Sequence, residues 1–230
     1  MPHIQPEVVP VVVYHGEFKL SHEDFDRIMR PHMGDANILA GVGDGFNTPF
    51  TVCNVSKDGV SLDWSYSRSS TGEGDPLYRP NATTEEARQI PQALLDEIAA
   101  RNLAEPWSTI LSPEAIKTHH VFAWVSRCVG MTREEVDKAS AQGVCFAGDS
   151  WHAMPIFGGE GGNHAILDGI ELAEAIQNAE GDLQNAIKKF YAGSFKRCQD
   201  AVKRSRQRFF VLHRPMSQWV EIAAKMALPA

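Results

Sequence analysis

The sequence lacks the cysteine patterns that mark metal-binding and disulfide-rich proteins. Its four cysteines, Cys53, Cys128, Cys145 and Cys198, are widely spaced, and no two of them form a CxxC pair. Structural zinc sites are typically built from such pairs, and small secreted domains need closely spaced cysteines for their disulfides. We therefore expect reduced core thiols, no metal site and a cytoplasmic protein.

Two further absences argue against membranes and nucleic acids as partners. The longest apolar runs are far shorter than the roughly 20 residues of a membrane-spanning helix, and no basic segment followed by an apolar one opens the chain. A formal net charge of -7 disfavours a polyanionic partner. Basic residues gather only between Lys196 and Arg208, a stretch that we interpret as a solvated helix face.

What is present is the composition of an ordinary globular protein. The chain has 230 residues, of which 43% are hydrophobic and 22% charged. This length suffices for one large domain or two small ones. The order of signals predicts an α+β fold, in which a mixed or antiparallel sheet with helices (1–130) precedes a strand-loop-helix segment and an all-helical tail (131–230). We expect the two parts to form one compact unit.

Local signals place the elements of the first part. Asp58-Gly59 predicts a hairpin between strands 50–55 and 60–66. In the second of these strands, Val60, Leu62, Trp64 and Tyr66 share one face, which is either core or the wall of a substrate pocket. Further strands are expected at 8–14, 37–42 and 121–125. Helix starts are predicted at Ser21, Thr83, Ser112, Thr132 and, in the tail, Ser217, and the first helix is expected to stop at Pro31.

The run from Val144 to Ala175 carries the strongest functional signal. Its first four residues are apolar without alternation, which favours a short buried strand at 144–147. Gly148-Asp149 ends that strand. The glycine-rich stretch 158–162 then leads into a helix, whose first N–H groups have no partner within the helix and can bind an anion or a carbonyl-rich ring.

This run resembles the second flavin-contacting motif of the class A flavoprotein monooxygenases, the para-hydroxybenzoate hydroxylase-like family. That motif is Gly-Asp-x-x-His, a Pro three residues on, then Gly-x-Gly-x-Asn-x-x-x-x-Asp-Gly/Ala. Residues 11–68 are similar, less sharply, to the substrate-domain sheet of fungal-type members, so the resemblance covers nearly the whole chain. The positions that match the motif are Gly148, Asp149, His152, Pro155, Gly159, Gly161, Asn163, Asp168 and Gly169.

The resemblance implies a set of FAD-binding residues. Asp149 would bond the ribityl chain, and Pro155 would lie beside the isoalloxazine ring. Backbone N–H groups from Gly161 through Gly162 to Asn163 would face the pyrimidine edge of that ring, with Gly159 completing the loop.

One part of the family pattern is missing. Members begin with a strand, a GxGxxG turn and a helix that hold the ADP part of FAD, and none of the GxG sequences here has that context. Without these contacts, tight FAD binding and oxygen insertion by this chain alone are not expected. We therefore expect no cofactor, or FAD if the ancestral site is still used. The strand 144–147 would also lose its neighbours, which predicts a homodimer that covers the open edge.

Three functions remain open from the sequence. The favoured one is a cofactor-free enzyme that cyclises, isomerises or dehydrates a small hydrophobic substrate of polyketide, terpenoid or aromatic type. Its candidate acids and bases are Asp149, His152 and Glu160. The second is an FAD-dependent monooxygenase fragment that needs a separate flavin-domain chain. The third is a non-catalytic ligand-binding protein. Candidate substrate contacts are Trp64, Tyr66, Arg68, His120, Trp124 and Asn163.

Overall fold

The computed structural model describes residues 4–219, which form two compact units. The sheet unit comprises residues 10–125 together with the segment from 212 onward. The motif unit comprises residues up to 9 together with 126–211. The strand expected at 8–14 is split, because Val8 lies in β1 (Glu7–Val8), which pairs with β9 (Arg127–Cys128) of the motif unit, while residues 11–14 belong to β2 (Val11–Leu20) of the sheet.

The sheet unit is built on an antiparallel sheet with strand order β3-β6-β7-β2-β8. The hairpin predicted around Asp58-Gly59 is confirmed, and its register pairs Ser56 with Gly59. A short strand, β5, pairs with both β4 and β7 beside this path. The strands are β2 (Val11–Leu20), β3 (Ile38–Leu39), β4 (Val42–Gly43), β5 (Phe46–Asn47), β6 (Phe50–Ser56), β7 (Gly59–Ser69) and β8 (His120–Ala123).

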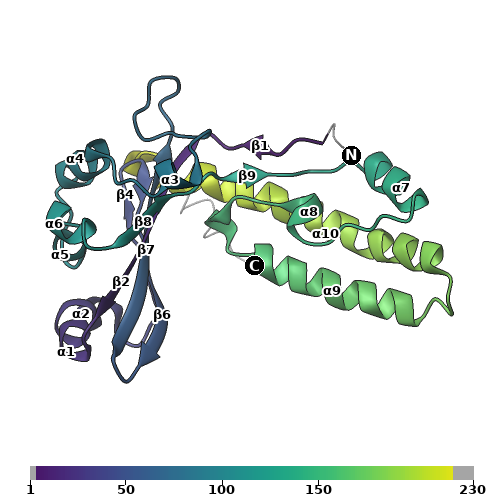
Figure 1. The fold of residues 1–230 in the computed structure, drawn as a ribbon, viewed down its shortest axis with the longest axis horizontal. Helices are drawn as coiled ribbons and strands as arrows, with labels where there is room; N and C mark the ends of the chain where they lie inside the picture. The colour runs from purple at the N-terminus through teal and green to yellow at the C-terminus, as the bar shows by residue number, and fades with distance from the viewer. Residues whose placement is uncertain (1–3, 220–230) are drawn as a thin grey trace. The chain divides into compact units, whose positions relative to one another are not determined.

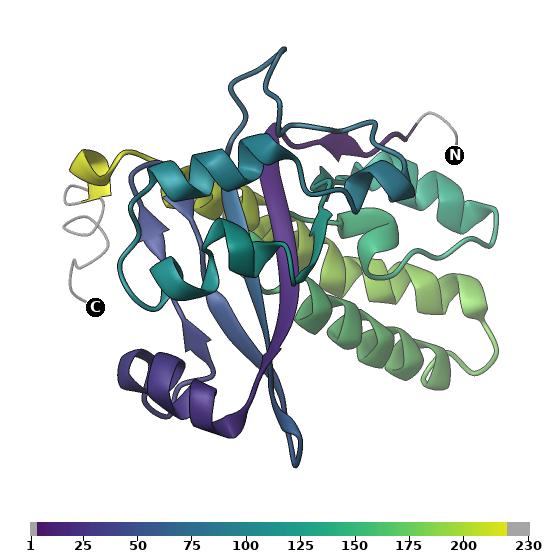
Figure 2. The same ribbon diagram turned by 60° about the vertical axis from the view of Figure 1, so that its left-hand side comes forward.

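One face of this sheet is covered by helices and holds the core. Because side chains alternate along a strand, Leu62, Trp64 and Tyr66 of β7 all turn to the covered face. There they pack with Leu94 and Ile98 of α4, and the views in Figures 1 and 2 agree in placing α4, α5 and α6 over that face. The helices of the unit are α1 (His22–Asp24), η1 (Phe25–Met29), α2 (Arg30–Met33), α3 (Thr84–Ala87), α4 (Gln92–Ala100), α5 (Trp107–Ile110) and α6 (Pro113–Ile116).

Two local predictions in the sheet unit were wrong. The first helix does not stop at Pro31, because Pro31 lies in the first turn of α2, where a missing N–H costs little, and the helix ends instead at Gly34. The strand expected at 37–42 is split into β3 and β4. β3 pairs with β6, whereas the bond from the Thr48 N–H to the Gly41 carbonyl extends the pairing of β4 with β5. Helix starts at Ser21, Thr83, Ser112 and Thr132 are confirmed.

The motif unit is mainly helical. Its elements after β9 are α7 (Arg133–Ala141), α8 (Asp149–His152), η2 (Ile156–Gly158), α9 (Gly161–Gln177) and α10 (Leu183–Leu212). Helices α9 and α10 run side by side in both ribbon views (Figures 1 and 2). Trp151 of α8 packs in their core against Phe190, Tyr191 and Phe195 of α10. The predicted α+β class with a helical C-terminal region is confirmed. The helix expected from Ser217 already includes Met216 in the described residues, so Ser217 is not its cap, and residues from 220 onward lie outside the described part.

The strand predicted at 144–147 is wrong. In residues 4–219 this segment pairs with no strand. Phe146 instead satisfies its backbone through one side chain, since the Tyr191 hydroxyl accepts its N–H at 2.6 Å and donates to its carbonyl at 3.1 Å. The predicted burial of the segment is wrong as well, because Val144 and Ala147 are exposed and Cys145 and Phe146 are only partly buried. No helix within residues 4–219 is long and apolar enough to cross a membrane.

Candidate functional site

A cavity of about 400 Å³ lies in the motif unit along the glycine-rich loop and the first turn of α9. It brings together five of the residues predicted to bind a cofactor. Asn163, the sixth, is exposed on α9 between the lining residues Gly162 and Ala165 but does not itself line the cavity. The lining residues are Asp149, Met154, Pro155, Ile156, Gly159, Gly161, Gly162 and Ala165.

The backbone of this loop is open to a ligand. A Cβ added at Gly159 or Gly162 would meet no other atom within 4 Å, and one at Gly161 would meet only Met154, at 3.8 Å. Packing within the chain therefore does not require glycine at 161 and 162. A flat ring that lies against the loop would require glycine there, because a side chain would occupy the same space. The first N–H groups of α9 face no helical partner and suit the carbonyl-rich edge of a flavin. The residues present therefore fit the isoalloxazine part of FAD.

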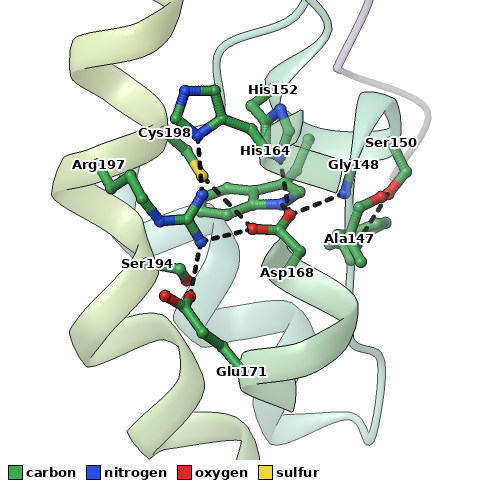
Figure 3. Close-up of polar contacts among 12 residues, drawn as sticks. Ala147, Gly148, Ser150, His152, His164, Asp168, Glu171, Ser194, Arg197 and Cys198 are labelled. Atoms are coloured by element: carbon green, nitrogen blue, oxygen red, sulfur yellow. Dashed lines mark hydrogen bonds and ion pairs between the residues drawn. The ribbon is translucent and has the colours of Figure 1, made fainter. Parts of the chain in front are cut away.

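A buried carboxylate fixes the loop that carries Asp149. Asp168 of α9 is 0% exposed and accepts hydrogen bonds from the Gly148 N–H at 2.9 Å and the Trp151 indole at 3.1 Å. It also binds His152 Nε2 at 2.7 Å and Arg197 Nη2 at 2.8 Å, as Figure 3 shows. Burial alone would raise the pKa of Asp168, but the donors from His152, Gly148 and Arg197 outweigh burial and hold it well below its usual range.

Other ionisable groups surround the Asp168 carboxylate and its partner Arg197. Arg197 of α10 also binds Glu171 at 2.6 Å and His164 Nδ1 at 2.9 Å. Burial, with the nearby Asp168 charge, raises the pKa of Cys198 to about 12, so this residue is a thiol at neutral pH. His152, Asp168 and Cys198 lie close enough together for a metal, but a cation there would face the Arg197 guanidinium and a protonated thiol. This donor set does not fit a metal ion.

Residues from α10 hold the far side of the loop. Ser205 donates to the Pro155 carbonyl, Arg208 donates to the Gly158 carbonyl at 2.8 Å, and Arg204 binds Glu160 at 3.1 Å. The basic stretch is otherwise solvated as expected, since Lys196, Lys203, Arg204 and Arg208 are exposed, whereas Arg197, at 20% exposure, departs from that interpretation. The sequence carried a signal for Arg197, because it continues the spacing of the apolar stripe that runs through Phe190 and Ser194.

The three predicted acid–base residues differ in their solvent exposure and in whether another side chain already binds them. His152 is 2% exposed and committed to Asp168. Glu160 is paired with Arg204, and this hydrogen bond holds the pKa of Glu160 below its usual range, which favours the carboxylate. Asp149 is exposed at the cavity. Asp149 is therefore the most accessible of the three.

The predicted substrate contacts of the sheet unit fall on opposite faces of the sheet. Trp64 and Tyr66 are fully buried on the helix-covered face, which leaves the core interpretation of that strand face. Arg68 is on the same face and binds Asp75 at 2.6 Å and Glu97 at 2.6 Å. His120 and Trp124 are exposed on the open face.

Sequence comparisons agree with this loop geometry. A family described as "FAD binding domain" matches residues 54–191. The chain is 61% identical over 233 residues to the "FAD-dependent monooxygenase adaC" of Aspergillus niger, covering 100% of this chain and 56% of that protein. It is 62% identical over 231 residues to the "FAD-dependent monooxygenase nscC" of Aspergillus fumigatus, covering 99% and 57%. The chain thus spans about half the length of these curated relatives.

Solved structures agree at the level of the fold. Klebsiella pneumoniae HpxO, complexed with FAD and uric acid, aligns with a TM-score of 0.65 at 15% identity, over 97% of this chain and 50% of its own. The 2,6-dihydroxypyridine-3-hydroxylase of Arthrobacter nicotinovorans aligns with a TM-score of 0.67 at 12% identity, over 92% and 53%. These findings support FAD as a cofactor of the family, and they do not support the expectation that no cofactor binds.

Proposed function

Because this chain belongs to the FAD binding domain family, that of the FAD-dependent monooxygenases, we propose that it is the ring-binding and substrate-binding part of such an enzyme. In this proposal it acts on a flat, hydroxylated aromatic substrate of polyketide type. The relatives are named only as FAD-dependent monooxygenases, so the substrate class is inferred from the sheet unit described below.

The observation that carries the proposal is the open glycine backbone at the cavity. Gly161 to Asn163 would meet the pyrimidine edge of the flavin, Pro155 would lie beside its ring, and Asp149 would bond the ribityl chain. Bound FAD supplies the electron transfer that oxygen insertion requires. The chain itself orients the ring, because Asp168 fixes Gly148 on one side of the loop and Arg208 fixes Gly158 on the other.

The proposal includes a second protein part that holds the ADP half of FAD. The face of α9 away from Asp168 leaves Ile166 66% exposed and Ile170 51% exposed, and Val144 in the unpaired segment 144–147 is also exposed. Exposed apolar residues of this size on one helix suit a packed interface. An ADP-binding α/β part, in the same protein or in a separate chain, would cover them. A homodimer, the arrangement expected from the sequence, is the alternative occupant.

The cofactor-free alternative has less support. Acid–base cyclisation, isomerisation or dehydration needs a group that can exchange protons with a substrate. His152 is buried against Asp168, and Glu160 is paired with Arg204. Asp149 alone would then have to serve as both acid and base. A ligand-binding role without catalysis would use the same cavity.

A titration with two flavins tests the proposal. If this chain holds only the ring part, riboflavin and FAD should bind with dissociation constants within about threefold of each other, measured by quenching of flavin fluorescence. Gly162→Val should weaken both by about tenfold or more, because its side chain enters the ring site. Gly193→Val is the matched control, since Gly193 is an exposed helical glycine of α10 with open space around it. Absence of flavin binding, even with an added ADP-binding part, would refute the proposal.

A further inference from the structure

The open face of the sheet carries a group of titratable and aromatic side chains around His15. Side chains alternate along β2 and β7, so odd-numbered residues turn away from the helix-covered core. The register pairs His15 with Ser65 on one side and with Phe122 on the other. The His15 cluster consists of His15, Glu17, Asp63, Ser65, Phe122 and Trp124.

His15 has a hydroxyl on one ring nitrogen and carboxylates near the other. Its Nδ1 lies 3.4 Å from Ser65 Oγ. Its Nε2 lies 3.9 Å from Asp63 Oδ2 and 4.0 Å from Glu17 Oε1. In the tautomer that donates Nδ1–H to Ser65, Nε2 keeps its lone pair and can accept a proton. The side chain of His15 is 17% exposed, so this nitrogen is shielded but reachable.

Two aromatic rings lie beside this imidazole, with their planes tilted by 31° relative to each other. The Phe122 ring centroid lies 5.0 Å from that of His15, and the Trp124 centroid lies 6.3 Å away. Phe122 and Trp124 are themselves 6.0 Å apart, and Trp124 is 43% exposed. Such rings stack well on a flat aromatic ligand. A hydroxyl on that ligand would then lie near the His15 ring.

We propose that His15 is the base that takes a proton from a ring hydroxyl of the substrate, which lies against Phe122 and Trp124. The inference rests on the proposed function, because it deepens the substrate class of the same enzyme. The substrate O–H bond breaks, its electron pair stays on oxygen as a phenolate, and the proton joins Nε2. The resulting phenolate has more electron density at its ortho and para carbons, which makes those carbons more reactive toward electrophiles.

The surrounding charges fit this transfer. Asp63 and Glu17 provide negative charge for the imidazolium that forms. Glu17 also lies 3.6 Å from His120 Nδ1, and Lys19 follows it on the same face of β2. Cys53 donates to Asp63 at 3.2 Å, and burial together with Asp63 raises the pKa of Cys53 to about 11, so this thiol adds no charge at neutral pH.

A spectrophotometric titration of a bound phenol tests the role of His15. The probe is 1,8-dihydroxyanthraquinone, whose phenolate absorbs at longer wavelength than its phenol. On the wild-type chain, the pKa of the bound hydroxyl should fall by about one unit or more relative to the free probe. His15→Gln should still bind within about threefold but return that pKa to the free value. His32→Gln, the same change at an exposed histidine of α2, should behave as wild type.

A second variant separates a lost base from a damaged fold. Asp63→Asn keeps the imidazole and should give a smaller pKa shift with unchanged binding. An unchanged shift in His15→Gln would overturn the inference, and so would failure of the wild-type chain to bind the probe. Because no flavin is present, a His15-dependent shift in a chain that never binds flavin would sustain the base and refute only the proposed function.

Discussion

The motif unit and the sheet unit each bury a cluster of charges, and the two clusters hold different kinds of segment. In the motif unit, the central group is the Asp168 carboxylate, whose donors include Gly148 and Arg197. In the sheet unit, the central group is the Arg68 guanidinium, which binds Asp75 and Glu97. A buried ion that loses its partner costs about 3–5 kcal/mol, so each cluster fixes the backbone that carries its partners.

The difference lies in what those partners border. Asp149, the residue after Gly148, lines the cavity, so the Asp168 cluster fixes a segment of the cavity wall. Asp75 lies in the loop before α3 and Glu97 in α4, where the Arg68 cluster borders the core around Tyr66. Buried charge alone therefore does not identify a site. A buried charge points to a functional site when its hydrogen-bond partners also support the wall of a cavity.

The largest effect on both stability and flavin binding is expected from removing the Asp168 carboxylate. Asp168→Ala leaves Arg197 without one of its buried partners and frees Gly148, so we expect a loss of about 3–5 kcal/mol in unfolding free energy. Riboflavin binding should be lost with it. Urea unfolding followed by tryptophan fluorescence measures the first effect, and flavin quenching in native buffer measures the second. Asp168→Asn, which keeps an acceptor oxygen, serves as the milder variant if the alanine variant does not fold.

The matched control is Arg68→Met, which removes the centre of the other cluster. It should destabilise the chain by a similar amount, because Asp75 and Glu97 lose their cation. Flavin affinity in native buffer should stay within about threefold of wild type. Equal losses of flavin binding in both variants would contradict the distinction between the clusters.

Much of the fold was predictable because the signals were local. A capping box needs only residues three apart, so the starts after Thr83 and Thr132 followed from the sequence, as did the turn at Asp58-Gly59. The segment 144–147 was mispredicted because a strand is defined by a neighbour. In the residues described, that neighbour is replaced by the Tyr191 hydroxyl from far along the chain.

The candidate site, like the fold, was predictable where the signal was local in the sequence. The glycines and Asp149, which line the cavity, could be named because they belong to one contiguous motif in the sequence. The roles of Asp168, Arg197 and Ser205 depend on how α9 and α10 pack, and His15 depends on the strand register that brings Asp63 beside it. Neither kind of contact is visible in the spacing along one sequence.

Lowering the pH should reduce the unfolding free energy through both clusters, by less than the substitutions above. The pKa of Asp168 is held below its usual range against the opposing effect of burial, and hydrogen bonds from Arg68 lower that of Asp75. A carboxyl with a lowered folded-state pKa stabilises the fold above its unfolded value of about 4 and loses this contribution as pH falls. Unfolding free energy should change little between about pH 7 and 5 and then drop by up to about 1.4 kcal/mol per pH unit for each carboxyl.

Urea titrations at a series of pH values measure this dependence. Asp168→Asn should show a shallower decline below about pH 4, because one of the carboxyls with a lowered pKa is gone. A stability that rises as pH falls from 5 to 3 would contradict the assignment of both carboxyls.

The smallest effect on stability is expected on the outer face of α9, opposite Asp168. Ile170→Ser removes an apolar side chain that is 51% exposed and leaves the Asp168 cluster intact, so the unfolding free energy should change by less than about 0.5 kcal/mol. Binding of an ADP-binding part, measured by titration calorimetry, should nevertheless weaken by about tenfold, because burying that side chain is worth about 1.4 kcal/mol or more. Ile38→Ser, the same change at an isoleucine of β3 that is 61% exposed, lies in the sheet unit and not on this helix; it is the control and should leave binding unchanged. If Ile170→Ser instead destabilised the chain by several kcal/mol and spared assembly, the outer face of α9 would belong to the fold of the motif unit and not to an interface.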